Sequence, residues 1–135
     1  MSITAIQSVQ LHDEKDELIV LDQTLLPNET VYLHLTTLEE IWDAIFHLKV
    51  RGAPAIGIAA AYGIYLGVKQ SKAFTYVQFA ADFEKAKQYL ASSRPTAVNL
   101  FWALDRMEDR LKREANKEIS AIKLALKDEA ESIRL

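Results

Sequence analysis

All four glycines of the chain lie within residues 51–67, which read RGAPAIGIAAAYGIYLG. The small residues of this stretch fall on one stripe at spacings of three and four, the period of a helix that begins at Pro54 and ends near Gln70. A glycine inside a helix costs about 1 kcal/mol relative to alanine, so a sequence tolerates it where another backbone must come close. The stretch therefore predicts a tightly packed core helix. The GxxxG spacing at residues 63–67 adds little, because its special meaning belongs to membrane helices.

A helix is also expected just before this stretch. Thr37 and Glu40 form a capping box ahead of an apolar stripe. We expect this helix to end near Val50, with Gly52 as its left-handed stop.

Three more helices are expected downstream. One is capped by Thr75 with Gln78, one follows the break at residues 92–96, and one starts at about Lys117. Their apolar stripes, with that of the helix after Thr37, predict a core. Its expected members include Ile41, Trp42, Ile45, Val77, Phe79, Phe83, Ala86, Leu90, Val98, Trp102, Leu104, Met107, Leu111, Ile119, Ile122, Leu126 and Ile133.

The first third of the chain has the period of strands instead. Residues 3–11, 17–26 and 30–35 are rich in β-formers and are joined by short polar connections. Short connections favour an antiparallel meander. The predicted fold class is α+β, mainly α: a small three-stranded antiparallel sheet over 1–36 and a bundle of about five helices over 37–135, together one domain.

Composition excludes several functions. A net charge of −3 argues against nucleic acid as the main partner, and the absence of cysteine excludes disulfides, a thiolate nucleophile and a cysteine-ligated metal in this chain. The N-terminus lacks the basic region and apolar run of a signal peptide. Every apolar stretch is too short or too charged to be a membrane span. We therefore expect a cytoplasmic protein without a membrane partner.

The segment Arg51-Gly52-Ala53-Pro54 has the features of an anion site. It stands at the start of the glycine-rich helix, where unpaired backbone N–H groups and the helix dipole favour negative charge. Gly52 and Ala53 allow a ligand close to the backbone, and the guanidinium of Arg51 has a bidentate geometry suited to phosphate. The alternative is that Arg51 pairs with a carboxylate across the helix junction.

A second segment is built in the same way. Arg94-Pro95-Thr96 places another arginine, and another proline that we expect to open a helix, ahead of an apolar segment. Two such arginines could converge on one anionic ligand. The alternative is that Arg94 is an ordinary surface residue of a loop.

Other polar residues suggest no chemistry of their own. His12, His34 and His47 have no metal-ligand spacing, so no metal site is expected. The charges of residues 105–113 are typical of a solvated helix face with (i, i+4) pairs. Trp42 and Trp102 fall on apolar stripes and are expected in the core.

These segments are the ones that carry a family resemblance. VRGAPAIGIAAAYG (50–63) with SRPTAVNLFWALDRM (93–107) resembles the N-terminal part of the S-methyl-5-thioribose-1-phosphate isomerases. Their family also contains ribose-1,5-bisphosphate isomerase and the regulatory subunits of translation initiation factor 2B. The similarity extends through ELIVLDQTLLP (17–27) and the helix after Thr37, so it covers essentially the whole chain.

The resemblance implies an aldose–ketose isomerase of methionine salvage. Such enzymes convert 5-methylthioribose 1-phosphate into 5-methylthioribulose 1-phosphate without a cofactor. By position, Arg51, Gly52 and Ala53 match the family's substrate-contacting turn, and Arg94 matches its second substrate arginine. Their implied role is to bind and orient the phosphate.

The family also differs from this chain. Its members are more than twice as long, with a Rossmann-like C-terminal domain that holds the catalytic cysteine and aspartate. The resemblance therefore implies no catalytic residue in this chain, a missing C-terminal domain as partner, and a homodimer as a further expected assembly. We expect a cut piece of an isomerase, or a natural short chain, that is inactive alone.

Three alternatives remain open from the sequence. The enzyme could act on another sugar 1-phosphate, because the arginine turn addresses the phosphate and not the methylthio group. The chain could be a non-catalytic regulatory or scaffolding domain, although such a domain has no need of both arginine motifs. It could also be a free-standing helical interaction module, since the last helix has no stop signal.

Overall fold

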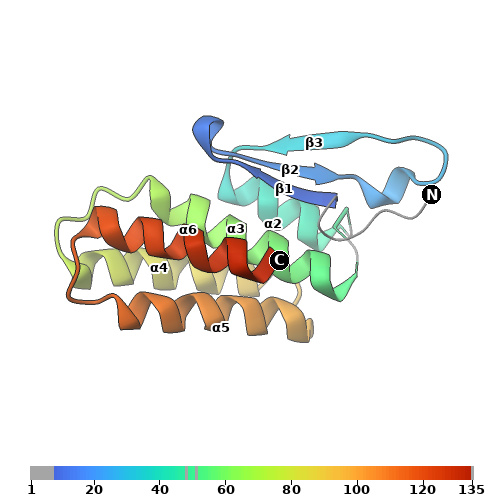
Figure 1. The fold of residues 1–135 in the computed structure, drawn as a ribbon. Helices are drawn as coiled ribbons and strands as arrows, with labels where there is room; N and C mark the ends of the chain where they lie inside the picture. The colour runs from blue at the N-terminus through green and yellow to red at the C-terminus, as the bar shows by residue number, and fades with distance from the viewer. Residues whose placement is uncertain (1–7, 48, 51, 135) are drawn as a thin grey trace.

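The computed structural model describes residues 8–47, 49–50 and 52–134. Figure 1 shows a small sheet lying over a layer of helices. The strands are β1 (Val9–His12), β2 (Glu17–Leu21) and β3 (Tyr32–Leu35), with short 3-10 turns η1 (Asp13–Lys15) and η2 (Gln23–Leu25) after the first two. The helices are α2 (Leu38–Phe46), α3 (Ala53–Lys69), α4 (Tyr76–Ala91), α5 (Val98–Arg113) and α6 (Ile119–Arg134). The predicted α+β class, mainly α, is confirmed.

The sheet is the predicted antiparallel meander, in the order β1-β2-β3. Val9 pairs with Val20, and Leu18 pairs with Leu35. These four side chains are buried and belong to the same hydrophobic core as the helices, so one face of the sheet covers the bundle. Of the first predicted strand, residues 3–7 lie outside the described part of the chain.

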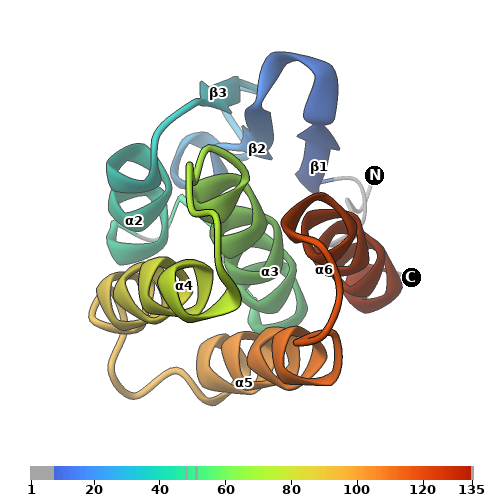
Figure 2. The same cartoon turned by 90° about the vertical axis from the view of Figure 1, so that its left-hand side faces the viewer.

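Helix α3 is the centre of the molecule. Seen end-on in Figure 2, it is surrounded by α2, α4, α5 and α6, with the strands above. A Cβ added at Gly63 would lie 3.0 Å from Cγ2 of Ile41, and one at Gly67 would lie 3.1 Å from Cδ1 of Leu38. Both contacts are with α2, so the glycines of this stripe let α2 pack close against α3, as the sequence indicated.

The predicted helix caps of α2 and α4 are confirmed. In α2 the hydroxyl of Thr37 accepts from the Glu40 N–H, and the Glu40 carboxylate accepts from the Thr37 N–H, which makes a complete capping box. At α4 the Thr75 hydroxyl accepts from the Gln78 N–H. Each side chain satisfies a first-turn donor that the helix itself leaves unpaired.

The expected end of α2 was wrong. The helix ends at Phe46, not near Val50, and Gly52 is the N-cap of α3 instead of a stop for α2. The carbonyl of Ala44 accepts from the N–H groups of both Lys49 and Val50. These bonds close the C-terminus of α2, and none of the turn residues that the structure describes has a left-handed backbone.

Three residues expected in the core are exposed. Val77 is 77% exposed, Val98 is 78% exposed and Trp102 is 52% exposed. The rest of both predicted stripes is buried as expected. In α4 it consists of Phe79, Phe83, Ala86 and Leu90, and in α5 of Leu104, Met107 and Leu111, to which Leu100 and Ala103 are added.

Charged side chains of α5 connect helices as well as facing solvent. The predicted (i, i+4) pairing is present, for example between Lys112 Nζ and Glu108 Oε1 at 3.5 Å, and Arg110 Nε donates to Glu114 Oε1 at 3.0 Å. However, Arg106 and Arg110 also bond across to Glu129 of α6, whose side chain is 9% exposed. Burial raises the pKa of Glu129, but the hydrogen bonds from the two arginines outweigh it and hold that pKa below its ordinary value.

Helix α6 runs antiparallel to α3. Near its start, Lys123 Nζ donates to the carbonyls of Lys69 and Ser71 at the end of α3. Near its end, Glu131 accepts from the hydroxyl of Tyr62 at 2.8 Å. The last turn of α6 therefore lies towards the end of the bundle where α3 begins. In the described ranges, every helix is too short or too polar to cross a bilayer.

Candidate functional site

The turn at Gly52 has a backbone that glycine alone adopts readily. Its φ is +88° and its ψ is 139°, while an added Cβ would meet nothing within 4 Å. Conformation, not lack of space, therefore requires glycine here. Among the residues that the structure describes, no side chain caps α3, and Pro54 lies in its first turn. The N–H groups of Ala53 and Ala55 are thus free of a capping side chain, which is the condition for anion binding at a helix start.

The structure describes only part of the predicted segment at Arg51 to Pro54. Arg51 lies outside the described residues, and Ala53 is described as the first residue of α3 without its side chain. Gly52 itself is exposed, and its carbonyl accepts from the Ile56 N–H at 3.0 Å. The backbone on both sides of Arg51 is thus described.

Arg94 lies in the loop between α4 and α5. Its side chain is partly exposed and forms no hydrogen bond or ion pair with the residues that the structure describes. Its carbonyl accepts from the Ala97 N–H at 2.9 Å, which makes residues 94–97 a β-turn with Pro95 in the second position. The expectation that Pro95 opens the helix was therefore wrong, because α5 begins at Val98.

Two serines fix this loop to the bundle. The Ser93 hydroxyl is buried and donates to the Leu90 carbonyl at 2.6 Å. The Ser92 hydroxyl donates to the Tyr89 carbonyl and accepts from the indole N–H of Trp42 on α2 at 2.9 Å. Sequence reasoning missed the bond from Trp42, because the spacing of a stripe does not show which edge of an indole reaches a partner.

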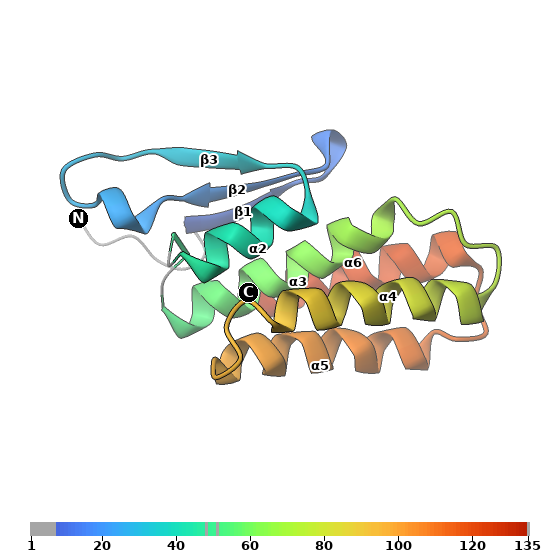
Figure 3. The ribbon, with the colours of Figure 1, turned by 180° about the vertical axis from the view of Figure 1, so that it is seen from behind.

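The Gly52 turn and the Arg94 loop lie at the same end of the molecule. Figure 1 and Figure 3, which view it from opposite sides, both show α3 and α5 starting there. A Cβ on Gly57 would lie 3.5 Å from the carbonyl oxygen of Asn99, so α3 and α5 touch near their first turns. Gly57 is about 6 Å along α3 from its first residue. The contact between the first turns of α3 and α5 thus places the Gly52 turn and the Arg94 loop at one end of the bundle.

The phenols near the bundle axis are not poised as general bases. Tyr62 is buried, and both its burial and its hydrogen bond to Glu131 raise its pKa. Burial and a hydrogen bond to Asp13 likewise raise the pKa of Tyr65. A phenol whose pKa is raised in this way stays protonated near neutral pH, so both act as structural donors.

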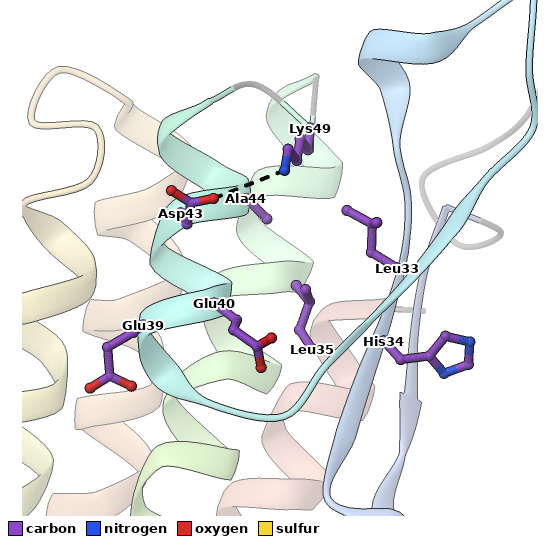
Figure 4. A pocket seen from close by; sticks show the side chains of 8 residues that line it. All are labelled: Leu33, His34, Leu35, Glu39, Glu40, Asp43, Ala44 and Lys49. Carbon is purple, nitrogen blue, oxygen red and sulfur yellow. Dashed lines mark ion pairs between the residues drawn. The ribbon is translucent and has the colours of Figure 1, made fainter.

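A second hollow lies between β3 and α2 (Figure 4). Glu39, Glu40 and Asp43 line it, and Lys49 Nζ is 4.0 Å from Asp43 Oδ2. Hydrogen bonds from the backbone and hydroxyl of Thr36 hold the pKa of Glu40 below its ordinary value. A hollow with three carboxylates and one lysine repels a phosphate, so the anion site is not here.

The histidines have local partners. His34 Nδ1 is 2.9 Å from Glu17 Oε2, and His47 Nδ1 is 3.0 Å from Asp43 Oδ1. In Figure 4 the ring of His34 points away from the hollow. Among the residues described, no three His, Cys, Asp or Glu side chains gather in a way that would hold a metal ion.

Comparison with known proteins gives consistent matches. Residues 49–134 match the Initiation factor 2 subunit family. The chain is 60% identical over 129 residues to methylthioribose-1-phosphate isomerase of Symbiobacterium thermophilum and 55% identical over 125 residues to 5-deoxyribose 1-phosphate isomerase of Petrotoga mobilis. These matches cover 96% and 93% of this chain. They cover 36% of each relative, so the chain spans about a third of the length of its curated relatives.

Two solved structures resemble the fold. The crystal structure of 5-methylthioribose 1-phosphate isomerase from Pyrococcus horikoshii superposes with a TM-score of 0.87 at 39% identity, over 93% of this chain and 35% of that one. The delta subunit of translation initiation factor eIF-2B from A. fulgidus superposes with a TM-score of 0.82 at 35% identity, over 93% and 36% of the two chains.

Proposed function

The chain belongs to the initiation factor 2 subunit family, and from this premise we propose that it is the phosphate-binding N-terminal domain of a sugar 1-phosphate isomerase. Its sheet over residues 1–36 and its helices over 37–135 form that domain together. The relatives at 50% identity or more are named as isomerases of a ribose 1-phosphate. Identity of this size favours the same class of reaction here.

The observation that carries the proposal is the state of Arg94. Its partly exposed guanidinium has no partner among the described residues, and its loop adjoins the uncapped start of α3. A cation left without a carboxylate beside free N–H groups is the arrangement that binds a phosphate dianion. Arg51 supplies the second guanidinium of the proposed site, next to Gly52 and Ala53.

In the reaction these groups position the substrate. An aldose 1-phosphate becomes a ketose 1-phosphate when the ring oxygen leaves C1 and a hydrogen moves from C2 to C1. The phosphate on C1 prevents ordinary ring opening, so the sugar must be held while other groups transfer protons. Two arginines and a helix start fix the phosphate, and with it the position of C1 and C2.

The proton transfer itself is assigned to the remainder of the enzyme. The chain has no cysteine, and its buried tyrosines stay protonated as structural donors. We therefore expect residues 1–135 to bind the sugar phosphate weakly and to show no turnover alone. A natural setting in the cytoplasm, a role in methionine salvage and a homodimeric assembly belong to the same proposal.

The two names among the relatives give two candidate substrates. One is 5-methylthioribose 1-phosphate and the other is 5-deoxyribose 1-phosphate. Both are ribose 1-phosphates without a hydroxyl on C5, and both present the same phosphate to Arg94. We propose the first as the main substrate, because the 60% identical relative carries that name. A non-catalytic regulatory domain is the other candidate, favoured by the resemblance to the delta subunit.

The test is a fusion of residues 1–135 to the remaining two-thirds of the Symbiobacterium isomerase. We expect the fusion to turn over one or both sugar phosphates, and Arg94→Gln to lower kcat/KM by about 100-fold or more through loss of a charged phosphate contact. The matched control is Arg113→Gln, an arginine at the far end of α5 whose side chain is 65% exposed. No turnover by a folded fusion, or an Arg94→Gln variant as active as the control, would refute the proposal.

A further inference from the structure

The outer face of α5 presents an apolar surface beside the Arg94 loop. Val98 is 78% exposed and Trp102 is 52% exposed, and one helical turn separates them. We infer that this Val98–Trp102 face is where the C-terminal remainder of the isomerase packs. The inference rests on the proposed function, because it names the partner that completes the same site.

The side chains of the Val98–Trp102 face are already held in position without a partner. The guanidinium of Arg106 lies over the Trp102 ring, 5.5 Å from its centroid, and Glu129 of α6 holds that guanidinium in place. A shallow hollow beside the ring is lined by Trp102, Asp105, Arg106, Glu108 and Asp109. A fixed tryptophan with an arginine and a charged rim has the composition of the centre of a protein interface.

The position of the face selects its occupant. Relatives of this chain are nearly three times as long, and the fold matches an N-terminal part of theirs. In its last turn, helix α6 bonds through Glu131 to Tyr62, in the middle of α3. Glu129 on α6 is bonded to Arg106 on α5, so the last turn of α6 lies beside the first half of α5. Polypeptide that continues from α6 therefore emerges next to the Val98–Trp102 face.

The proposed reaction also requires the C-terminal remainder to lie near the Val98–Trp102 face. A general acid or base must come within about 3 Å of the atom it serves, and C2 of a sugar 1-phosphate lies only about 4 Å from the phosphorus. The polypeptide that carries these groups must therefore approach the Arg94 loop closely. Val98 follows Arg94 by four residues, so a body that reaches the sugar also covers Val98. A second copy of this chain would add none of the missing groups.

The absence of cysteine makes the inference directly measurable. Val98→Cys introduces the chain's single thiol on the face, and Val77→Cys introduces one at the start of α4 with the same exposure, 78% against 77%. Helix α4 runs opposite to α5, so the control lies at the other end of the bundle (Figure 3). Each variant is labelled with a maleimide, both as the free chain and as the full-length fusion. Mass spectrometry of the digested protein then measures the rate of labelling at the introduced cysteine.

We expect both thiols to react rapidly in the free chain. In the fusion we expect the labelling rate of Val98→Cys to fall by at least about tenfold, because labelling then requires local opening. The rate of Val77→Cys should be unchanged. Adding Trp102→Asp should restore labelling at Val98→Cys without unfolding the fusion, since Trp102 is half-exposed.

Two results would overturn the inference. The first is equal labelling of the two thiols in the fusion. The second is protection of Val98→Cys already in the free chain, together with a dimer by light scattering, which would make a second copy the occupant. The measurement needs no sugar phosphate. Protection without turnover would therefore keep the surface and reject the isomerase, and turnover without protection would do the reverse.

Discussion

The indole N–H of Trp42 donates a 2.9 Å hydrogen bond to the hydroxyl of Ser92, and this bond ties α2 to the loop that carries Arg94. Trp42 also stacks on Phe46, with ring centroids 4.8 Å apart, and on Tyr89, with centroids 6.0 Å apart. The chain that leaves α2 leads into the Gly52 turn. Trp42 thus links α2, which precedes the Gly52 turn, to the loop that carries Arg94.

Trp42→Phe keeps an aromatic ring in the stack and removes the hydrogen bond. We expect the free energy of unfolding to fall by about 1 kcal/mol and hydrogen exchange of residues 92–97 to become faster. Ser92→Ala removes the same bond from the other side. If the bond acts as described, the double variant is less destabilised than the sum of the two single variants. Fully additive effects in urea unfolding would contradict it.

Gly52→Ala tests the backbone of the turn. There is room for the methyl group, but a φ of +88° with a ψ of 139° disfavours any residue with a Cβ. We expect a loss of about 1–3 kcal/mol in the free energy of unfolding. A loss of that size, measured by chemical denaturation, would show that strain is the cause, since steric exclusion is absent. No change in stability would mean that the turn relaxes to another conformation.

Gly63→Ala and Gly57→Ala separate close packing from helix propensity. At Gly63 the new Cβ would lie 3.0 Å from Cγ2 of Ile41, whereas at Gly57 its nearest neighbour is Asn99 O at 3.5 Å, an ordinary contact. We expect Gly63→Ala to destabilise by about 1–3 kcal/mol and Gly57→Ala to be neutral or stabilising by up to about 1 kcal/mol. Thermal unfolding of the pair distinguishes them. Equal effects would mean that α2 shifts freely on α3.

Glu129→Gln tests the charged link between α5 and α6. We expect a loss of about 2 kcal/mol at pH 7, because Arg106 and Arg110 lose a buried carboxylate partner but remain partly exposed. The control is Asp109→Asn, an exposed carboxylate on α5 without an ion pair among the described residues.

This loss should depend on pH in a defined direction. The folded pKa of Glu129 lies below its ordinary value of 4.5, so its contribution is complete above that value and is lost as pH falls through the lower, folded pKa. The difference between wild type and Glu129→Gln should therefore be constant near neutral pH and shrink in acid. A difference that grows in acid would contradict this sign.

Much of the fold could be predicted because its signals are local. Thr37 with Glu40, and Thr75 with Gln78, mark helix starts through contacts within one turn, and the stripe of glycines indicates close packing wherever the partner helix lies. The strand alternation of Leu33 and Leu35 likewise needs only neighbouring residues.

The errors arose where two local patterns compete. Residues 98 and 102 fit a helical stripe as well as 100 and 104 do, and only the position of α3 decides which stripe is buried. Pro95 suits either the first turn of a helix or the second position of a β-turn, and the bond from Ala97 to Arg94 selects the turn. The link from Arg106 to Glu129 depends on how two helices dock, which no spacing shows.

The enclosure of α3 has a consequence for how a ligand is received. Helix α3, which begins at the Gly52 turn, is packed against four helices and the sheet, so the position of its first turn is set by the core of the molecule. Binding of an anion there therefore costs the protein little conformational entropy. Adjustment to sugars of different shape is expected in the Arg94 loop, which is held by the hydroxyls of Ser92 and Ser93 and the indole of Trp42. Selection for a new sugar substrate is therefore expected to leave the sequence at the N-terminus of α3 unchanged and to substitute residues in that loop.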